Sequence, residues 1–172
     1  MVNIMNSTFR NLRRWPFTTI LSARRYGYDN IFAPHSAKLG SLLCMAILRG
    51  DNREVQVMLD NGAPLNHQDE PDGWTPLIYS IYYHNPQAWE MLWEKGADLS
   101  QSDFAGRTPL MITAITGNDQ LLQRFLAAGV SPDAVDYRNK TALDFALEFH
   151  NQKCADLLSE AVRKKVKGQA NE

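Results

Sequence analysis

A six-residue block recurs along this chain at a fixed interval, and this regularity constrains the fold more than any other feature. The block reads Asp-Gly-Trp-Thr-Pro-Leu at 72–77, Ala-Gly-Arg-Thr-Pro-Leu at 105–110 and Arg-Asn-Lys-Thr-Ala-Leu at 138–143. The threonines of successive blocks are therefore 33 residues apart. Self-similarity at this period indicates stacked units, each of which is too small to bury its own apolar face.

Each block also predicts where a helix begins. A threonine can cap a helix N-terminus, and proline is tolerated at the first helical position because its missing N–H would go unpaired there. Thr75-Pro76 and Thr108-Pro109 therefore predict helix starts. Small and apolar residues then recur on one face of each first helix, and in the last unit these are Leu143, Ala146 and Leu147. The pattern predicts turns after the first helices at Gly50, His84, Gly117 and His150, and left-handed caps after second helices at Gly62, Gly96 and Gly129.

The Thr-Pro-Leu blocks and the Gly-Ala-Asp-Leu sequence at 96–99 resemble the ankyrin repeat, whose signature is a 33-residue period that opens on Thr-Pro-Leu-His-x-Ala. This resemblance implies an all-α solenoid of about four helix-turn-helix units with short β-turn fingers between them. The units are expected at 39–69, 70–102, 103–135 and 136–161, between an N-terminal capping segment at 1–38 and a basic C-terminal tail at 162–172.

Residues 1–38 admit two interpretations, because they are basic and also contain apolar side chains. They carry six basic residues against the single acid Asp29. One interpretation is a folded cap whose aromatic residues pack on the first unit. The other is a sorting segment at 1–31, since arginine-rich and acid-poor leaders are typical of mitochondrial presequences, and similar compositions occur in proteins that bacteria deliver into host cells.

The charge and cysteine content limit the partners and the compartment of the chain. Residues 39–161 contain 17 acidic and 8 basic residues, which disfavours nucleic acid and favours a basic protein partner. Cys44 and Cys154 are far apart in apolar surroundings, so we expect buried free thiols and a reducing, cytoplasmic compartment. The longest nearly apolar run, at 39–48, is about half as long as a membrane-crossing helix, so no membrane span is expected.

The sequence shows no pattern of reactive or metal-binding residues. The four histidines, at 35, 67, 84 and 150, have no second ligand at metal-binding spacing. Cys44 falls inside a helix that we expect to be buried, which makes it a poor nucleophile. Phosphate loops, nucleophile elbows and zinc-protease motifs do not occur. We therefore expect a chain without catalytic, cofactor or metal sites.

The resemblance implies where a protein partner would lie. In ankyrin proteins a partner usually meets the finger tips and the exposed ends of the first helices, which line a concave surface. Six aromatic residues hold such positions, where we expect them to face solvent, and aromatic and arginine side chains are typical of binding hot spots. A competing interpretation is that Phe104 and Tyr137 fold inward against the neighbouring finger. The predicted protein-binding residues are Arg49, Asp72, Trp74, Tyr82, Tyr83, Phe104, Arg107, Thr116, Tyr137, Arg138, Lys140 and Phe149.

The sequence thus favours a non-catalytic interaction module, either an adaptor or an inhibitor that covers its partner's surface. The alternative is an effector that the segment at 1–31 directs into another cell or an organelle. An enzyme is disfavoured, because flanking segments of 38 and 11 residues are too short to add a catalytic domain.

Overall fold

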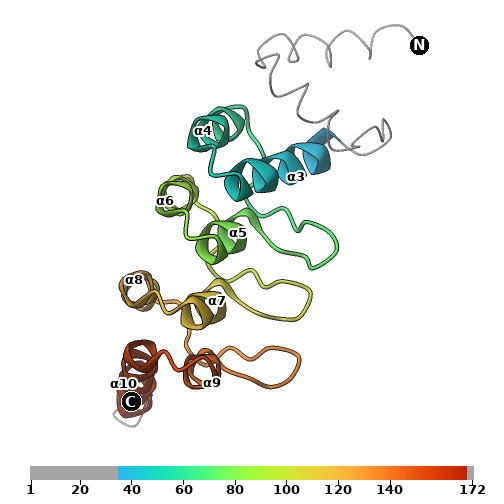
Figure 1. The fold of residues 1–172 in the computed structure, drawn as a ribbon. Coiled ribbons are helices and arrows are strands. Elements are labelled where there is room, and N and C mark those ends of the chain that lie inside the picture. Colours follow the sequence, from blue (N-terminus) through green and yellow to red (C-terminus); the bar gives the residue numbers. More distant parts are fainter. Residues whose placement is uncertain (1–34, 170–172) are drawn as a thin grey trace, which may run out of the picture.

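The computed structural model describes residues 35–169, which form a stack of four helix pairs (Figure 1). The first helices of the pairs lie in one row, the second helices lie in another, and the connecting loops project from the row of first helices. The described residues form helices and no strand, so the expected all-α repeat solenoid is confirmed. The pairs are α3 (His35–Leu48) with α4 (Asn52–Asp60), α5 (Pro76–Tyr82) with α6 (Pro86–Glu94), α7 (Pro109–Thr116) with α8 (Asp119–Ala127), and α9 (Ala142–Glu148) with α10 (Gln152–Gln169).

Threonine side chains cap the helices that begin at the repeated block, as predicted. Thr75, Thr108 and Thr141 immediately precede α5, α7 and α9. Each threonine Oγ1 accepts a hydrogen bond from the backbone N–H three residues further on, at 3.2–3.4 Å. A cap of this kind is worth about 1 kcal/mol, so the block recurs because each first helix needs the same start.

The chain turns at the positions that the repeat pattern predicts, and the residues at these positions have a left-handed backbone. The turns between paired helices have φ from +53° to +73°, even where the residue is a histidine. A glycine with φ from +79° to +85° follows each of α4, α6 and α8. Left-handed backbone cannot continue a helix, so these positions set the helix lengths. The turn residues are Gly50, His84, Gly117 and His150, and the glycines are Gly62, Gly96 and Gly129.

Neighbouring units bury one another's apolar faces. Helix α5 packs between α3 and α7, and α7 packs between α5 and α9. Ser80, Thr113 and Ala146 occupy equivalent positions in this row and are fully buried. Their small side chains let the helices of the row approach one another closely.

The loops between pairs form three fingers. We call residues 69–74 finger 1, residues 103–107 finger 2 and residues 136–140 finger 3. The Phe104 N–H donates to the carbonyl of Asp72 at 3.0 Å, and so connects finger 2 to finger 1. Its ring lies over Gly73, where an added Cβ would come within 2.4 Å of the ring carbons. The backbone and the ring of Phe104 therefore both hold the spacing between these two fingers.

A polar cluster joins the first and second units at the base of finger 1. Ser41 on α3 donates to Asp69 Oδ1 at 2.7 Å, and Tyr79 on α5 donates to Asp69 Oδ2 at 3.2 Å. His67 Nε2 lies 3.1 Å from Ser41 Oγ, and its ring packs against Gly40, where any side chain would collide with it. Burial raises the pKa of Asp69, but hydrogen bonds from His67, Ser41 and Tyr79 outweigh burial and hold this pKa below its ordinary value.

The structure differs from the sequence-based expectation at the ends of the stack. Helix α3 begins at His35, before the expected start of the first unit, and α10 continues to Gln169, beyond the expected end of the fourth. Leu147, which the helical periodicity places on one face with Leu143 and Ala146, is 54% exposed and does not belong to the core. Its equivalents Ile81 and Ala114 are buried in helices with a neighbour on both sides, whereas the described neighbours of α9 are α7 and α10.

The two interpretations of the N-terminal segment, a cap or a sorting signal, concern residues that lie almost entirely outside the described part of the chain. Within residues 35–169, no helix combines the length and the apolar character needed to cross a bilayer.

Gly73→Ala is expected to destabilise the fold more than Gly62→Ala. Both glycines have a left-handed φ, which costs another residue about 1 kcal/mol. At Gly73 the new methyl would also displace the Phe104 ring, which adds about 1–3 kcal/mol, whereas nothing lies within 4 Å of the corresponding point at Gly62. Urea unfolding of the two variants measures the difference, and equal losses would contradict the packing of Phe104 over Gly73.

Asp69→Asn is expected to lower the free energy of unfolding by about 1–3 kcal/mol, because the amide places a donor opposite the hydroxyl of Ser41 or Tyr79. A carboxylate with a lowered folded pKa stabilises the fold above its unfolded pKa, and this contribution is lost as pH falls through the folded pKa. The difference in free energy of unfolding between wild type and variant should thus stay constant above about pH 5 and shrink below about pH 4. Unfolding curves across this range test the prediction, which is wrong if the difference persists in acid. Asp60→Asn, on the exposed side of α4, is the matched control and should have a much smaller effect.

Candidate protein-binding surface

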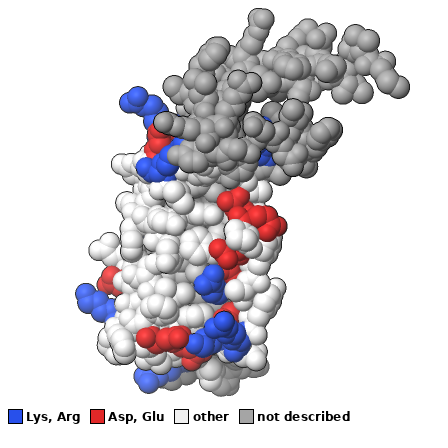
Figure 2. Space-filling model, turned by 45° about the vertical axis from the view of Figure 1, so that its right-hand side comes forward, with Lys and Arg blue, Asp and Glu red and all other residues white. Residues whose placement is uncertain are grey.

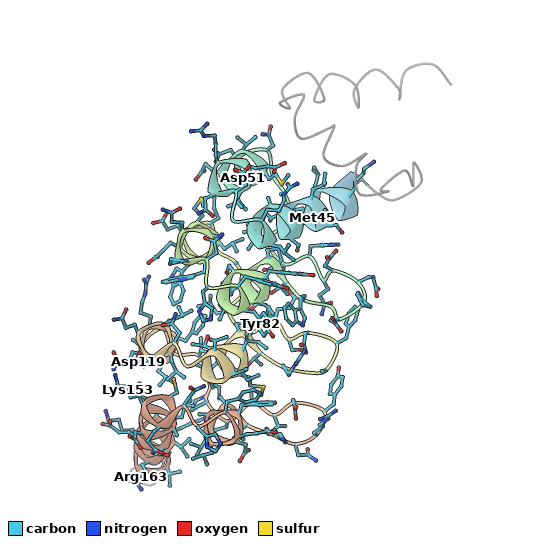
Figure 3. All side chains as sticks on the ribbon, viewed as in Figure 1. Met45, Asp51, Tyr82, Asp119, Lys153 and Arg163 are labelled. Atoms are coloured by element: carbon cyan, nitrogen blue, oxygen red, sulfur yellow. The ribbon has the colours of Figure 1, made fainter. Side chains whose placement is uncertain are left out.

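Four aromatic residues of the second unit form a cluster around the C-terminal end of α5. The ring centroid of Trp74 lies 5.3 Å from that of Tyr79 and 4.8 Å from that of Tyr82. The ring of Tyr83 stacks against Tyr79, with 6.1 Å between centroids. Figure 3 shows Tyr82 in the row of first helices, beside the fingers. We call these four residues the aromatic cluster.

The rings of the aromatic cluster differ in exposure. Tyr82 is 43% exposed and Tyr83 is 46% exposed, as expected. Trp74 is half-buried, so the expectation that its ring faces solvent is wrong. The physical reason is Tyr79, a residue that the repeat pattern did not indicate and that packs edge-on against the indole. The indole Nε1 is buried and has no hydrogen-bond partner in the described part of the chain.

Phe104 and Tyr137 pack against neighbouring fingers and also remain accessible. The Phe104 ring lies over Gly73, and the Tyr137 ring lies over Gly106 in the same way. This packing agrees with the inward interpretation, yet Phe104 is 45% exposed and Tyr137 is 79% exposed. Each ring therefore spaces two fingers with one side and leaves the other side open to a partner.

Most of the basic residues predicted for this surface are neutralised by acids of the chain itself. Arg138 is exposed and has no ion pair among the described residues. Arg107 is half-buried, and the carboxylate of its ion-pair partner Asp103 is fully buried. The pairs are Arg49 with Glu54 at 2.5 Å, Arg107 with Asp103 at 2.7 Å, and Lys140 with Glu148 at 2.7 Å.

The tip of finger 1 carries two exposed acids, Glu70 and Asp72, which have no ion pair within residues 35–169. Figure 2 shows acidic side chains gathered on the finger side, toward the N-terminal end of the described stack. The last two predicted residues lie further along the surface. Thr116 is half-buried and donates its hydroxyl to a backbone carbonyl of α7, and Phe149 is 50% exposed at the end of α9.

A depression beside Tyr83 extends this surface toward the first unit. It has a volume of about 410 Å³ and is lined by the turns of the first two units, including Leu48, Arg49 and His84. Leu48 is 48% exposed at its edge. The repeat pattern indicated Arg49 and Tyr83 separately but not their shared depression, because turns of different units meet only in the stack.

The potentially reactive side chains of the described region have structural roles. Cys44 and Cys154 are free and buried, as predicted, and burial raises the pKa of both thiols. Ser41 donates its hydroxyl hydrogen to Asp69, and His67 presents the same Nε2 to both residues, so the three do not form a nucleophile with an oriented base. Residues 35–169 contain no group of three or more His, Cys, Asp or Glu side chains placed to hold a metal ion.

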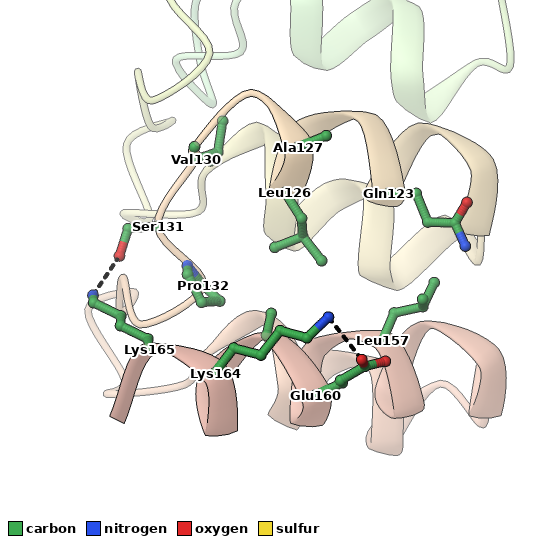
Figure 4. Close-up of a pocket in the computed structure, with 12 residues that line it drawn as sticks. Gln123, Leu126, Ala127, Val130, Ser131, Pro132, Leu157, Glu160, Lys164 and Lys165 are labelled. Atoms are coloured by element: carbon green, nitrogen blue, oxygen red, sulfur yellow. Dashed lines mark hydrogen bonds and ion pairs between the residues drawn. The ribbon is translucent and has the colours of Figure 1, made fainter. Parts of the chain in front are cut away.

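A larger groove lies between second helices α8 and α10 (Figure 4). It has a volume of about 520 Å³, and apolar side chains such as Leu126, Val130 and Leu157 line it. The lysines at its edge are paired within the chain, Lys164 with Glu160 at 2.8 Å and Lys165 with Asp133 at 2.5 Å. This groove therefore offers a partner neither an aromatic ring nor an unpaired lysine.

Comparisons with known proteins agree with this architecture. A family model described as ankyrin repeats (3 copies) matches residues 27–103 and 100–168. Ankyrin repeat domain-containing protein M-T5 of Myxoma virus is 28% identical over 111 residues, which are 64% of this chain and 23% of that protein. Ankyrin repeat and SOCS box protein 6 of Mus musculus is 34% identical over 128 residues, 70% of this chain and 30% of that protein. The 2-5A-dependent ribonuclease of Homo sapiens is 36% identical over 80 residues, 46% of this chain and 11% of that protein.

The chain spans less than a third of the length of each of these relatives. Ankyrin repeats are generally protein–protein interaction modules and are typically non-catalytic. The family model covers most of the chain, over the same residues that form the capped and stacked helix pairs. This chain therefore belongs to the ankyrin-repeat family.

Proposed function

We propose that this chain is a non-catalytic binding module, an adaptor or an inhibitor, which holds another protein against its fingers and the ends of its first helices. The observation that carries this proposal is a set of rings, each at least 43% exposed, along that one side of the stack. These rings belong to Tyr82, Tyr83, Phe104, Tyr137 and Phe149.

Rings in these positions favour binding for two physical reasons. Removing apolar surface from water stabilises a complex by about 25 cal/mol per Å², so a partner that covers these rings gains binding free energy. Aromatic side chains also have few rotatable bonds, so they lose little conformational entropy when a partner orders them. Phe104 and Tyr137 are 33 residues apart, so a partner that lies across the fingers meets an equivalent ring in fingers 2 and 3.

A basic protein fits this surface better than a nucleic acid does. Glu70 and Asp72 lack ion pairs within the described chain and are free to attract cations. Of the three cations in the fingers, Arg107 and Lys140 are already paired with carboxylates, and Arg138 alone has no ion pair within the described chain. A phosphate backbone would therefore meet repulsion at finger 1 and little compensation elsewhere.

Changing Tyr82 and Tyr83 together to alanine is expected to reduce partner capture at least about tenfold, which corresponds to losing about 1.4 kcal/mol of binding energy. Affinity capture from the native cell, with the full chain as bait and quantitative mass spectrometry, measures the loss. The double variant Glu94→Ala with Gln120→Ala changes exposed residues of the second helices and is the matched control. Both variants should keep wild-type circular dichroism. Undiminished capture by the tyrosine variant would refute the proposed surface.

A further inference from the structure

The aromatic cluster offers hydrogen-bond donors that nothing in the described chain uses. Trp74 Nε1, which can only donate, is buried and unpartnered. The hydroxyls of Tyr82 and Tyr83 have no hydrogen bond within residues 35–169, whereas the hydroxyl of Tyr79 is already bound to Asp69. Buried donors without acceptors are rare in native proteins, because each one loses its bond to water and gains nothing in return. The buried indole donor is therefore satisfied only when an acceptor reaches it.

A polyproline II segment has the chemistry that such a surface lacks. Helices and strands use their carbonyls internally, whereas the carbonyls of a polyproline II segment are free to accept. Proline also has no backbone N–H, so the segment brings no unwanted donor against the donors of Trp74, Tyr82 and Tyr83. Proline-rich segments bind surfaces lined by aromatic rings in several unrelated folds, because the segment is extended before it binds and loses little entropy.

The acids of finger 1 specify a further property of the segment. Glu70 and Asp72 are exposed and unpaired within the described chain, and they lie in the same finger as Trp74. A basic side chain next to the prolines would pair with these acids. Arginine suits this position best, since its planar guanidinium can bind a carboxylate and stack on a tyrosine ring.

We propose that the aromatic cluster binds a proline-rich segment of the partner protein in the polyproline II conformation. One carbonyl of the segment accepts from Trp74 Nε1, its proline rings lie on Tyr82 and Tyr83, and a neighbouring basic residue faces Glu70 and Asp72. This inference rests on the proposed function, because it names the kind of partner that the same surface takes.

Binding requires a neighbouring side chain to move, since Trp74 Nε1 is covered in the free chain. The Tyr82 ring is the nearest to the indole, at 4.8 Å between centroids, and it is 43% exposed. No hydrogen bond within the described chain holds its hydroxyl, so it can change rotamer without breaking one. Such side-chain changes at an interface are common while the backbone stays fixed.

The test is an NMR titration of the full, ¹⁵N-labelled chain with a blocked synthetic peptide of one arginine followed by a run of prolines. Trp74→Phe removes one indole signal and thereby assigns it. The Trp74 indole N–H signal is expected to shift downfield as it gains an acceptor, while the signals of Trp89 and Trp93, on α6, stay in place. Changing Tyr82 and Tyr83 to alanine should weaken peptide binding about tenfold or more.

Two matched comparisons test the separate parts of the proposal. A peptide with glycine and serine in place of the prolines should leave the Trp74 signal unchanged, and an equal shift would overturn the polyproline requirement. Glu70→Gln with Asp72→Asn should weaken binding of the arginine peptide several-fold but not that of a glutamine peptide. Equal effects on both peptides would overturn the basic flank.

Failure of this inference is distinguishable from failure of the proposed function. If the proline peptide leaves the Trp74 signal in place while the tyrosine variant still loses its cellular partner, polyproline recognition is wrong and the surface assignment stands. A partner segment that shifts the Trp74 signal as a helix, without prolines, would overturn this inference in the same way. If the tyrosine variant keeps its cellular partner, both proposals are wrong.

Discussion

Packing of each first helix against the first helix of the next unit is the interaction on which the rest of this structure depends. A pair of helices this short cannot cover its own apolar face, so stability comes from contact between successive units. Ser80, Thr113 and Ala146 keep that contact close. Close stacking also brings the fingers together, and the hydrogen bond from Phe104 to Asp72 joins two of them. The proposed binding surface is thus held in place by contacts that lie in the core and between the fingers.

Much of this fold is determined by short stretches of sequence and can be predicted from them directly. The threonine caps, the positions of the turns and the left-handed glycine caps were predicted correctly because each depends on a few adjacent residues. The ends of the stack follow different rules. Leu147 has the spacing of a core residue, but its burial depends on a neighbour that the helix pattern of α9 does not encode. Similarly, the sequence around Asp69 indicates only a turn. The stacking of the first two units brings Ser41 and Tyr79 to its two carboxylate oxygens.

The candidate surface was predictable in position but only partly in chemistry. The position of each residue within the repeat correctly predicted that five rings are exposed, because the backbone sets the exposure at those positions. It misjudged Trp74, whose burial depends on contact with Tyr79. It also gave no sign that Arg107 and Lys140 are paired within the chain, since Asp103 and Glu148 serve equally well as turn and helix residues in the sequence. With those cations neutralised, the acids of finger 1 dominate the charge that a partner would meet.

The unpaired indole of Trp74 is informative because the other buried polar side chains of the described chain have hydrogen-bond partners. Asn85 and Asn151 donate to backbone carbonyls of the preceding units, and the buried carboxylates of Asp103 and Asp136 accept backbone N–H groups within their fingers. Trp74 Nε1 is the one buried side-chain nitrogen or oxygen without a partner in the described chain. A fold that satisfies its polar groups so consistently violates that rule mainly where function requires it. Because this exception lies beside the exposed rings of Tyr82 and Tyr83, an acceptor from a second protein can reach it once a neighbouring side chain moves.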